Sequence, residues 1–326
     1  MKKLIAGVFI SAIFVYLSLR GIKYQELIKG LGDARYFFLI PSATLLFSIS
    51  LLRSVRWGII LSPVEKVGQK KLFPITCIGY LAIVMVPMRL GELVRPYLLS
   101  DKSKIPMSTA LATIFVERVL DSMILCCMLF FVFFRTHLPA WVLKTGYSSL
   151  IALVILSLSM LFLYFNTKFT IKILHPVLKR LPQRFQIRIE DFIQRFLEGF
   201  KIIGSLQKLF YAIIFTISIW ILSGLAIYSL FTFHNFQLPF ISAFIVLVFI
   251  IISTSIPAAP GMVGNFQFAC IVALSLFNLN KEDAFIFSMV YYCLGMGIQI
   301  FLGLIFLPSM RLSLKETVRD IKNSFN

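Results

Sequence analysis

The sequence predicts an all-α polytopic membrane protein with about six full transmembrane helices and two broken helix hairpins that re-enter the membrane from opposite faces. The chain of 326 residues is 59% hydrophobic and 14% charged, more apolar surface than a soluble domain could bury. Apolar stretches long enough to cross the roughly 30 Å hydrocarbon core recur along it. Two further apolar stretches are interrupted by a Pro-x-x-x-Gly segment. We therefore expect residues 1–326 to form a single integral membrane domain.

The full transmembrane helices are predicted from the apolar windows. These windows lie at about 4–19, 36–52, 106–134, 147–165, 209–233 and 284–307. Residues 166–208 form the longest polar stretch, and its second half repeats apolar residues at helical spacing. We expect an amphipathic helix in this segment, lying on an anionic cytoplasmic leaflet or forming a polar extension of the following span.

The two interrupted stretches are residues 72–99, which break at Pro87 to Gly91, and residues 240–279, which break at Pro257 to Gly261. At about 1.5 Å per residue, the shorter arms cannot cross the hydrocarbon core, so each stretch is predicted to be a re-entrant hairpin. Transporters built from inverted repeats have broken helices of this kind, whose ends bind the substrate. The alternative is a chance match, since Pro and Gly are common in membrane helices.

The basic residues predict the orientation of the chain. It holds 32 Lys and Arg against 14 Asp and Glu, a formal net charge of +18. Lys and Arg accumulate in short cytoplasmic loops, and the best fit to this rule places both termini in the cytoplasm. We therefore expect a multi-pass protein of the cell inner (cytoplasmic) membrane. The positive charge favours anionic lipid headgroups as partners, and no stretch is polar for long enough to form a nucleic-acid-binding domain.

An unusual group of charges falls within or beside apolar segments. It consists of Arg89, Glu92, Arg95, Glu117, Arg118 and Asp121. A charged side chain at mid-bilayer costs at least about 2.5–3.5 kcal/mol, so such groups usually face a partner, a cavity or a substrate. Arginine forks suit phosphate recognition, and the acids could hold the arginines when the site is empty. Two alternatives remain open: the charges only pair with one another and join the helices, or the acids relay protons.

The second break supplies further candidate residues. Pro257, Pro260, Gly261 and Gly264 are expected to unwind the backbone, and Asn265 and Gln267 are the first polar side chains after it. Irregular backbone at membrane depth must be satisfied by protein or must line a wet cavity, because lipid cannot hydrogen-bond it. This requirement favours a substrate pathway.

Three motifs together resemble the membrane domain of lysylphosphatidylglycerol synthases. They are Pro87-Met-Arg-Leu-Gly-Glu-Leu-Val-Arg-Pro-Tyr-Leu-Leu, Glu117-Arg-Val-Leu-Asp121 and Pro257-Ala-Ala-Pro-Gly-Met-Val-Gly264. The resemblance implies an inner-membrane, flippase-like protein that moves or accommodates lipid. In the two-domain members, a C-terminal domain makes aminoacylated phosphatidylglycerol and the membrane part translocates it. We expect no synthase domain here, so aminoacyl transfer is not implied. Gln267 stands where many members have an acid, which puts a mechanism that needs a carboxylate there in doubt.

The function predicted from these observations is a lipid flippase. It would translocate a phosphate-bearing lipid, either a phospholipid or a glyco- or polyprenyl-phosphate lipid, across the cytoplasmic membrane. We expect no enzymatic activity, cofactor or metal, because the chain has no HExxH motif or P-loop and its three His lie in or beside predicted loops. Besides membrane lipids, a separate lipid-modifying enzyme is a candidate partner. The alternatives are a membrane enzyme acting on a lipid phosphate and a non-transporting scaffold for a lipid-modifying enzyme.

Overall fold

The computed structural model describes residues 2–32, 34–85, 91–135, 182–254 and 259–308, together with scattered positions between 148 and 162. The predicted span at 147–165 falls mostly outside the described residues, as do residues 166–181 of the polar stretch. Throughout the described part the regular secondary structure is helical. The fold is therefore an all-α polytopic membrane protein, as predicted.

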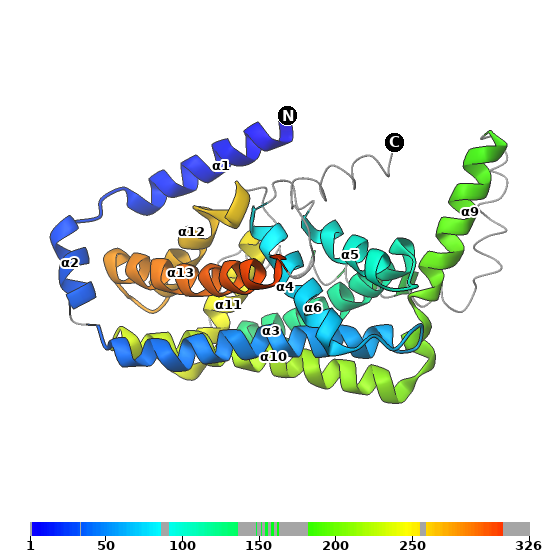
Figure 1. Cartoon of the computed structure of the whole chain (residues 1–326). Coiled ribbons are helices and arrows are strands. Elements are labelled where there is room, and N and C mark those ends of the chain that lie inside the picture. Colours follow the sequence, from blue (N-terminus) through cyan, green and yellow to red (C-terminus); the bar gives the residue numbers. More distant parts are fainter. Residues whose placement is uncertain are drawn as a thin grey trace.

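The helices follow one another in an order that repeats (Figure 1). The elements are α1 (Lys2–Leu19), α2 (Tyr24–Gly32), η1 (Tyr36–Phe38), α3 (Leu39–Leu61), α4 (Gln69–Met85), α5 (Val94–Lys102), α6 (Met107–Arg135), α9 (Gln183–Glu198), η3 (Lys201–Gly204), α10 (Leu206–Phe233), α11 (Phe240–Thr254), η4 (Pro260–Met262), α12 (Asn265–Ser275) and α13 (Lys281–Phe306). Three stretches in the described part are long and apolar enough to cross a membrane: Tyr36–Leu61, Leu206–Phe233 and Lys281–Phe306.

Helix α3 corrects the predicted boundaries. The predicted span ended at residue 52. In the structure the helix continues to Leu61, so Arg53 and Arg56 lie inside it. The prediction ended too early because a hydropathy scale treats every arginine as a fully hydrated charge and takes no account of partners such as those of Arg56. Arg56 is buried by neighbouring helices.

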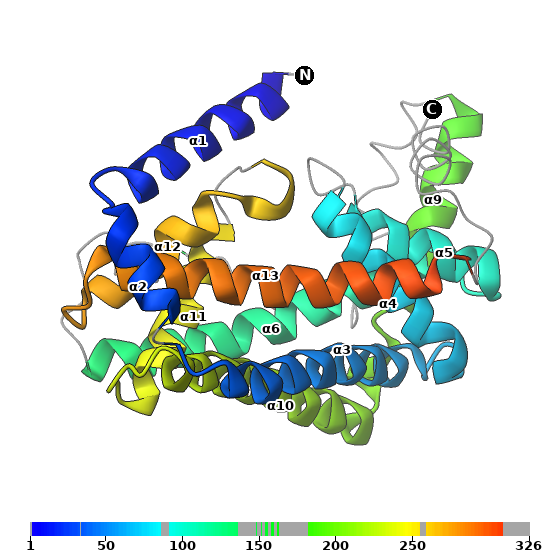
Figure 2. The ribbon, with the colours of Figure 1, turned by 60° about the vertical axis from the view of Figure 1, so that its left-hand side comes forward.

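Helices α3 and α10 form the central antiparallel pair. The hydroxyl of Ser42 donates a 3.1 Å hydrogen bond to the carbonyl of Ala226, and the hydroxyl of Ser229 donates one of 3.2 Å to the carbonyl of Phe38. These contacts define two ends of the molecule (Figure 2). We call end A the end where α3 stops, α6 begins and α10 begins. End B is the end where α10 stops and α13 begins.

The two broken hairpins enter from opposite ends. Helix α4 follows α3 at end A, and α5 returns to end A to begin α6. Helix α11 follows α10 at end B, and α12 returns to end B to begin α13. In Figure 2 both hairpins lie above the α3–α10 pair, α4–α5 toward the right-hand end and α11–α12 toward the left-hand end. The arms have between 9 and 17 residues, and the returning arms α5 and α12, with 9 and 11 residues, are too short to span the hydrocarbon core alone.

The two halves of the molecule repeat one pattern in inverted orientation. Each half consists of a long helix, two short arms and a second long helix: α3–α4–α5–α6 and α10–α11–α12–α13. The packing between the halves is reciprocal, because α4 packs against α13 and α11 packs against α6. This is the inverted repeat that the two Pro-x-x-x-Gly segments predicted.

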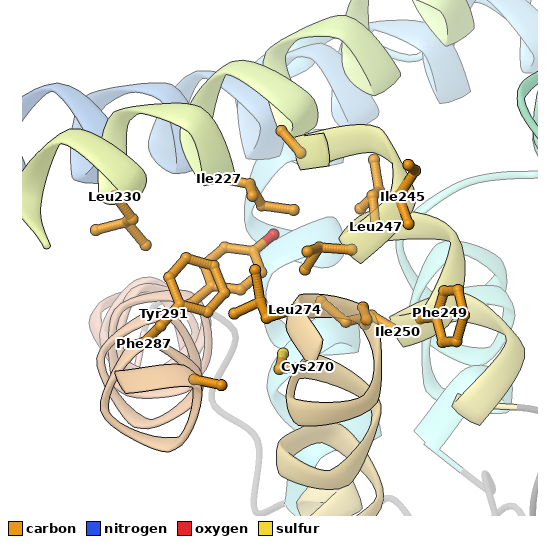
Figure 3. Close-up of a cluster of buried hydrophobic side chains, with 14 of the residues drawn as sticks. Ile227, Leu230, Ile245, Leu247, Phe249, Ile250, Cys270, Leu274, Phe287 and Tyr291 are labelled. Carbon is orange, nitrogen blue, oxygen red and sulfur yellow. The ribbon is translucent and has the colours of Figure 1, made fainter. Parts of the chain in front are cut away.

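The largest apolar cluster surrounds the second hairpin. Figure 3 shows Leu274 of α12 directed toward Ile227 and Leu230 of α10, with Phe287 and Tyr291 of α13 closing the cluster. In a membrane, lipid tails are as apolar as these side chains, so close van der Waals packing holds the helices together. At its end B edge, His234 stacks on Phe236 with ring centroids 5.1 Å apart, and burial lowers the pKa of His234 to about 4.

Helices α1 and α9 flank this repeat. The Lys281 ammonium donates to the carbonyls of Leu17 and Arg20, which caps α1 at end B. Helix α9 lies within the predicted amphipathic segment. It is joined to α6 by a 2.6 Å hydrogen bond from the hydroxyl of Thr109 to the carbonyl of Arg195.

Candidate functional site

The candidate site is a cluster of charges between α3, α4, α5 and α6, in the half of the molecule nearer end A. Arg53 and Arg56 project from one face of α3, because residues three apart lie on the same side of a helix. Glu117 and Asp121, four residues apart, do the same on α6. At about 1.5 Å per residue, Arg56 lies roughly 8 Å and Glu117 roughly 15 Å inside the helix ends at end A.

Three ion pairs form the buried part of this cluster: Arg95–Glu117, Arg56–Asp121 and a longer contact of 3.7 Å between Arg56 Nε and Glu117 Oε1. Arg95 Nη1 lies 2.9 Å from Glu117 Oε2, and both side chains are at most 3% exposed. Arg56 places its fork on Asp121, with Nη1 2.5 Å from Oδ1 and Nη2 3.3 Å from Oδ2. Thr216 of α10 accepts a further 3.1 Å hydrogen bond from Arg56 Nη1. These pairs connect four helices of the two halves.

Aromatic rings hold the arginines from the side. The Arg95 guanidinium lies 4.2 Å from the ring centroid of Trp57, and Trp57 donates a 3.1 Å hydrogen bond to Thr113, which fixes its ring. The Arg53 guanidinium lies 4.8 Å from the ring centroid of Tyr80. Stacking of this kind stabilises a cation by about 0.5–2 kcal/mol, depending on how far it is desolvated.

Not all of the cluster is closed. The Arg118 side chain is 49% exposed and the Asp121 side chain 19%, whereas Arg56, Arg95 and Glu117 are almost fully buried. Arg118 reaches Asp121 Oδ2 at 3.7 Å, a carboxylate that Arg56 already occupies. Arg53 is half-buried, and in the described part of the chain no carboxylate lies within ion-pair distance of it.

The predicted site residues divide into several groups. Arg95, Glu117, Arg118 and Asp121 lie together in the cluster, where Arg95 pairs with Glu117. Glu92 is half-buried and makes no ion pair or hydrogen bond with any described residue. Arg89 and Pro257 lie outside the described residues.

Four members of the cluster were missed by sequence reasoning: Arg53, Arg56, Trp57 and Tyr80. The signal that could have found them is the helical spacing of the two arginines next to an apolar window. Their partners lie far away along the chain, such as Asp121 for Arg56, so no local pattern could have shown the pairing.

The described part of the second break, residues 259–264, forms a separate group, and two of its backbone groups bond to neighbouring helices. Tyr292 of α13 donates a 2.8 Å hydrogen bond to the carbonyl of Gly261. The backbone N–H of Ala259 donates to the hydroxyl of Ser11 in α1 at 2.8 Å. Pro260 is exposed and Asn265 is buried. Here the unwound backbone obeys the rule that lipid cannot hydrogen-bond it, because α1 and α13 supply its partners.

Gln267 and Gly264 start helix α12. Gln267 Oε1 accepts a 2.8 Å hydrogen bond from the backbone N–H of Gly264, and Gln267 is buried. Gly264 has a φ of +88°, and a Cβ at this position would lie 2.6 Å from the carbonyl oxygen of Ser11. Only glycine fits both the backbone conformation and the approach of α1. In this conformation Gln267 caps a helix.

Helix α4 connects the two groups. Tyr80 faces the arginines, and Val84, one turn further along α4, lies beside the second break, with its carbonyl oxygen 4.0 Å from the position of a Cβ on Gly261. The structure thus places the last turn of α4 against η4. The charged cluster and Gln267 are linked through α4, and in the described part of the chain no hydrogen bond or ion pair joins them directly.

Comparison with known proteins assigns the family. The model of the lysylphosphatidylglycerol synthase TM region matches residues 4–303. Two membrane proteins of Methanocaldococcus jannaschii described as UPF0104 are similar: one is 27% identical over 71% of this chain and 95% of its own length, the other 25% identical over 86% and 85%. A UPF0104 membrane protein of Methanothermobacter thermautotrophicus is 24% identical over 90% of this chain and 92% of its own length. No solved structure matches the chain. Because the family model covers nearly the whole sequence, the chain belongs to the lysylphosphatidylglycerol synthase TM region family.

Proposed function

We propose that this protein is a lipid transporter that carries the phosphate-bearing headgroup of a membrane lipid across the cytoplasmic membrane while the acyl or prenyl tails stay in the bilayer. The family is associated with lipid handling, which supports the general assignment. The cluster supports the choice of a phosphate group, because arginine forks bind phosphate oxygens in pairs. The proposed activity is transport without chemical change of the lipid.

One observation carries the proposal: the described cluster holds more arginines than carboxylates. Arg56 and Arg95 are neutralised by Asp121 and Glu117, but Arg53 and Arg118 have no carboxylate of their own. Unpaired cations inside the membrane are costly, and proteins that keep them usually use them. An anionic headgroup that visits these two side chains would supply the missing counter-charge.

The arrangement of the hairpins supports a route for the headgroup. Because α4 of the first hairpin contacts η4 of the second, a small rotation of one half against the other would move this contact. Inverted repeats give two such positions of similar energy, one open to each side of the membrane. We propose that the headgroup binds beside α4 and that rocking of the halves exposes it alternately. On the orientation predicted above, the cluster then lies nearer the cytoplasmic face.

The test is headgroup sidedness in proteoliposomes. Purified protein is reconstituted with a fluorescently labelled phospholipid, and a membrane-impermeant quencher reports the fraction in the outer leaflet over time. We expect Arg53→Gln and Arg118→Gln to slow the exchange at least tenfold, while Arg195→Gln, an exposed arginine paired with Asp191, leaves it unchanged. If both cluster variants fold and move lipid at the wild-type rate, the proposed site is wrong.

A further inference from the structure

The open edge of the cluster carries a specific excess of charge. The buried pairs Arg95–Glu117 and Arg56–Asp121 each sum to zero. Arg118 shares the carboxylate of Asp121 with Arg56. Arg53 lies over the ring of Tyr80 and has no ion pair with a described carboxylate. The described cluster therefore keeps two positive charges that no described carboxylate balances.

These two charges border the same cluster. The guanidinium groups of Arg53 and Arg95 lie 4.8 Å and 5.6 Å from the ring centroid of Tyr80 on α4. Arg118 of α6 reaches the other side of this cluster at Asp121, 3.7 Å away, and Asp121 also pairs with Arg56. The half-buried Tyr80 makes no hydrogen bond to a described residue.

Buried nitrogen donors beside this place are also left without acceptors. Arg95 Nε and Nη2 are both buried, and neither has a hydrogen-bond partner in the described part of the chain. A buried donor without an acceptor costs roughly 1–3 kcal/mol, and more when it is charged. Cations without carboxylates and donors without acceptors are the complement of a small anion with several oxygens.

We propose that this site takes a phosphate group bearing two negative charges, a phosphate monoester or a diphosphate, in contact with Arg53, Arg118 and Tyr80. The assignment rests on the proposed function and narrows its substrate class. A phosphodiester headgroup carries one negative charge and would leave one arginine unbalanced. A zwitterionic headgroup would bring a further positive charge to a cluster that already has two unbalanced ones. The buried pairs Arg56–Asp121 and Arg95–Glu117 position the two binding arginines.

The test compares lipids that differ in headgroup charge, using the full chain purified in detergent micelles at pH 8. The probes are dioleoyl phosphatidic acid, a monoester that is close to doubly charged above its second pKa of about 6, and dioleoyl phosphatidylglycerol, a singly charged diester. We expect phosphatidic acid to have a Kd at least tenfold lower, equivalent to about 1.4 kcal/mol. The double variant Arg53→Gln/Arg118→Gln should bring the ratio of the two Kd values close to one, while Arg195→Gln should keep it.

Two controls separate the possible explanations. Arg53→Lys/Arg118→Lys keeps both charges and should keep the preference for phosphatidic acid. The thermal midpoint of the Gln variant in detergent is measured as well, and an unchanged midpoint assigns its loss of preference to the missing charges. Inorganic phosphate is added as a competitor: failure to displace phosphatidic acid at equal concentration assigns the site to lipid, whereas full displacement assigns it to free phosphate.

The outcomes also distinguish this assignment from the transport proposal. Equal Kd values for the two lipids in the wild type, with transport intact, would overturn the two-charge assignment and leave the transporter standing. A clear preference for phosphatidic acid without any transport would retain the site and overturn the transporter.

Discussion

The residues of the cluster divide into buried residues that pair with one another across helices and exposed residues that could contact a ligand. Glu117 lies 2.9 Å from Arg95 and 3.7 Å from Arg56, and its side chain is 1% exposed. It is therefore the centre of the buried part. Arg118, its neighbour in sequence, points to the open edge. Glu117 is thus buried in ion pairs, whereas Arg118, the next residue of the same helix, is half exposed. The spacing of the two residues alone could not predict this difference.

Replacing Glu117 by Gln tests the structural task. The change leaves two buried guanidinium groups without their shared carboxylate, and breaking a buried ion pair in this way typically costs about 3–5 kcal/mol. We expect a fall of that size in the free energy of unfolding, measured by denaturant titration in detergent. Glu198→Gln is the matched control: Glu198 is 47% exposed and pairs with Lys201 at 3.8 Å, so its loss should cost less than about 1 kcal/mol. Equal effects of the two changes would show that Glu117 is not the centre of the cluster.

The site could be predicted only in part from the sequence. The anomaly of charges among apolar residues identified Arg95, Glu117, Arg118 and Asp121, because the cost of a charge in hydrocarbon is a local property. Which charges neutralise each other is not local: Asp121 pairs with Arg56, which lies beyond the predicted end of its span. The two-charge excess becomes visible only when all the pairs are known.

The broken hairpins are the elements that the sequence predicted best. Their limits, 72–99 and 240–279, agree closely with α4–α5 and α11–α12. Proline and glycine act on the backbone directly, so a break is encoded where it occurs. The close packing of the arms was not predictable, since it depends on the separation of two helices. Gly91 approaches the backbone of α4 so closely that a Cβ there would lie 2.3 Å from the carbonyl carbon of Ala82.

The variant Gly91→Ala tests this close approach. The added methyl group would meet backbone atoms of Ala82 and Ile83, which cannot rotate away, so the two arms must separate. Overpacking of this kind costs about 1–3 kcal/mol or more, and we expect a lower thermal midpoint in detergent together with slower lipid exchange. Gly295→Ala is the control, because a Cβ at that position of α13 meets nothing within 4 Å. An unchanged midpoint for Gly91→Ala would contradict the observed contact between the arms.

At the scale of the whole molecule, the inverted repeat is the feature that the proposed transport requires, because it gives one chain related structures at both ends. The two halves share one order of elements, but they differ in content. The hairpin that enters from end A lies beside the arginine cluster, whereas the hairpin that enters from end B packs in the apolar cluster of Figure 3. The halves are thus alike in architecture and different in chemistry. We infer that the first half binds the headgroup and the second provides the surface against which it moves.

The inverted arrangement predicts that the two ends of the molecule lie on opposite sides of the membrane. Lys102 closes the first hairpin at end A, and Gln237 lies between α10 and α11 at end B, and both are exposed. In a variant whose five native cysteines are replaced by serine, we place one cysteine at a time, as Lys102→Cys or Gln237→Cys. A membrane-impermeant maleimide added to intact cells should label the Gln237→Cys protein at once and the Lys102→Cys protein only after permeabilisation, because the distribution of basic residues predicts that end A lies in the cytoplasm. Labelling of both from outside would refute the inverted arrangement, and exchanged labelling would refute only the predicted orientation.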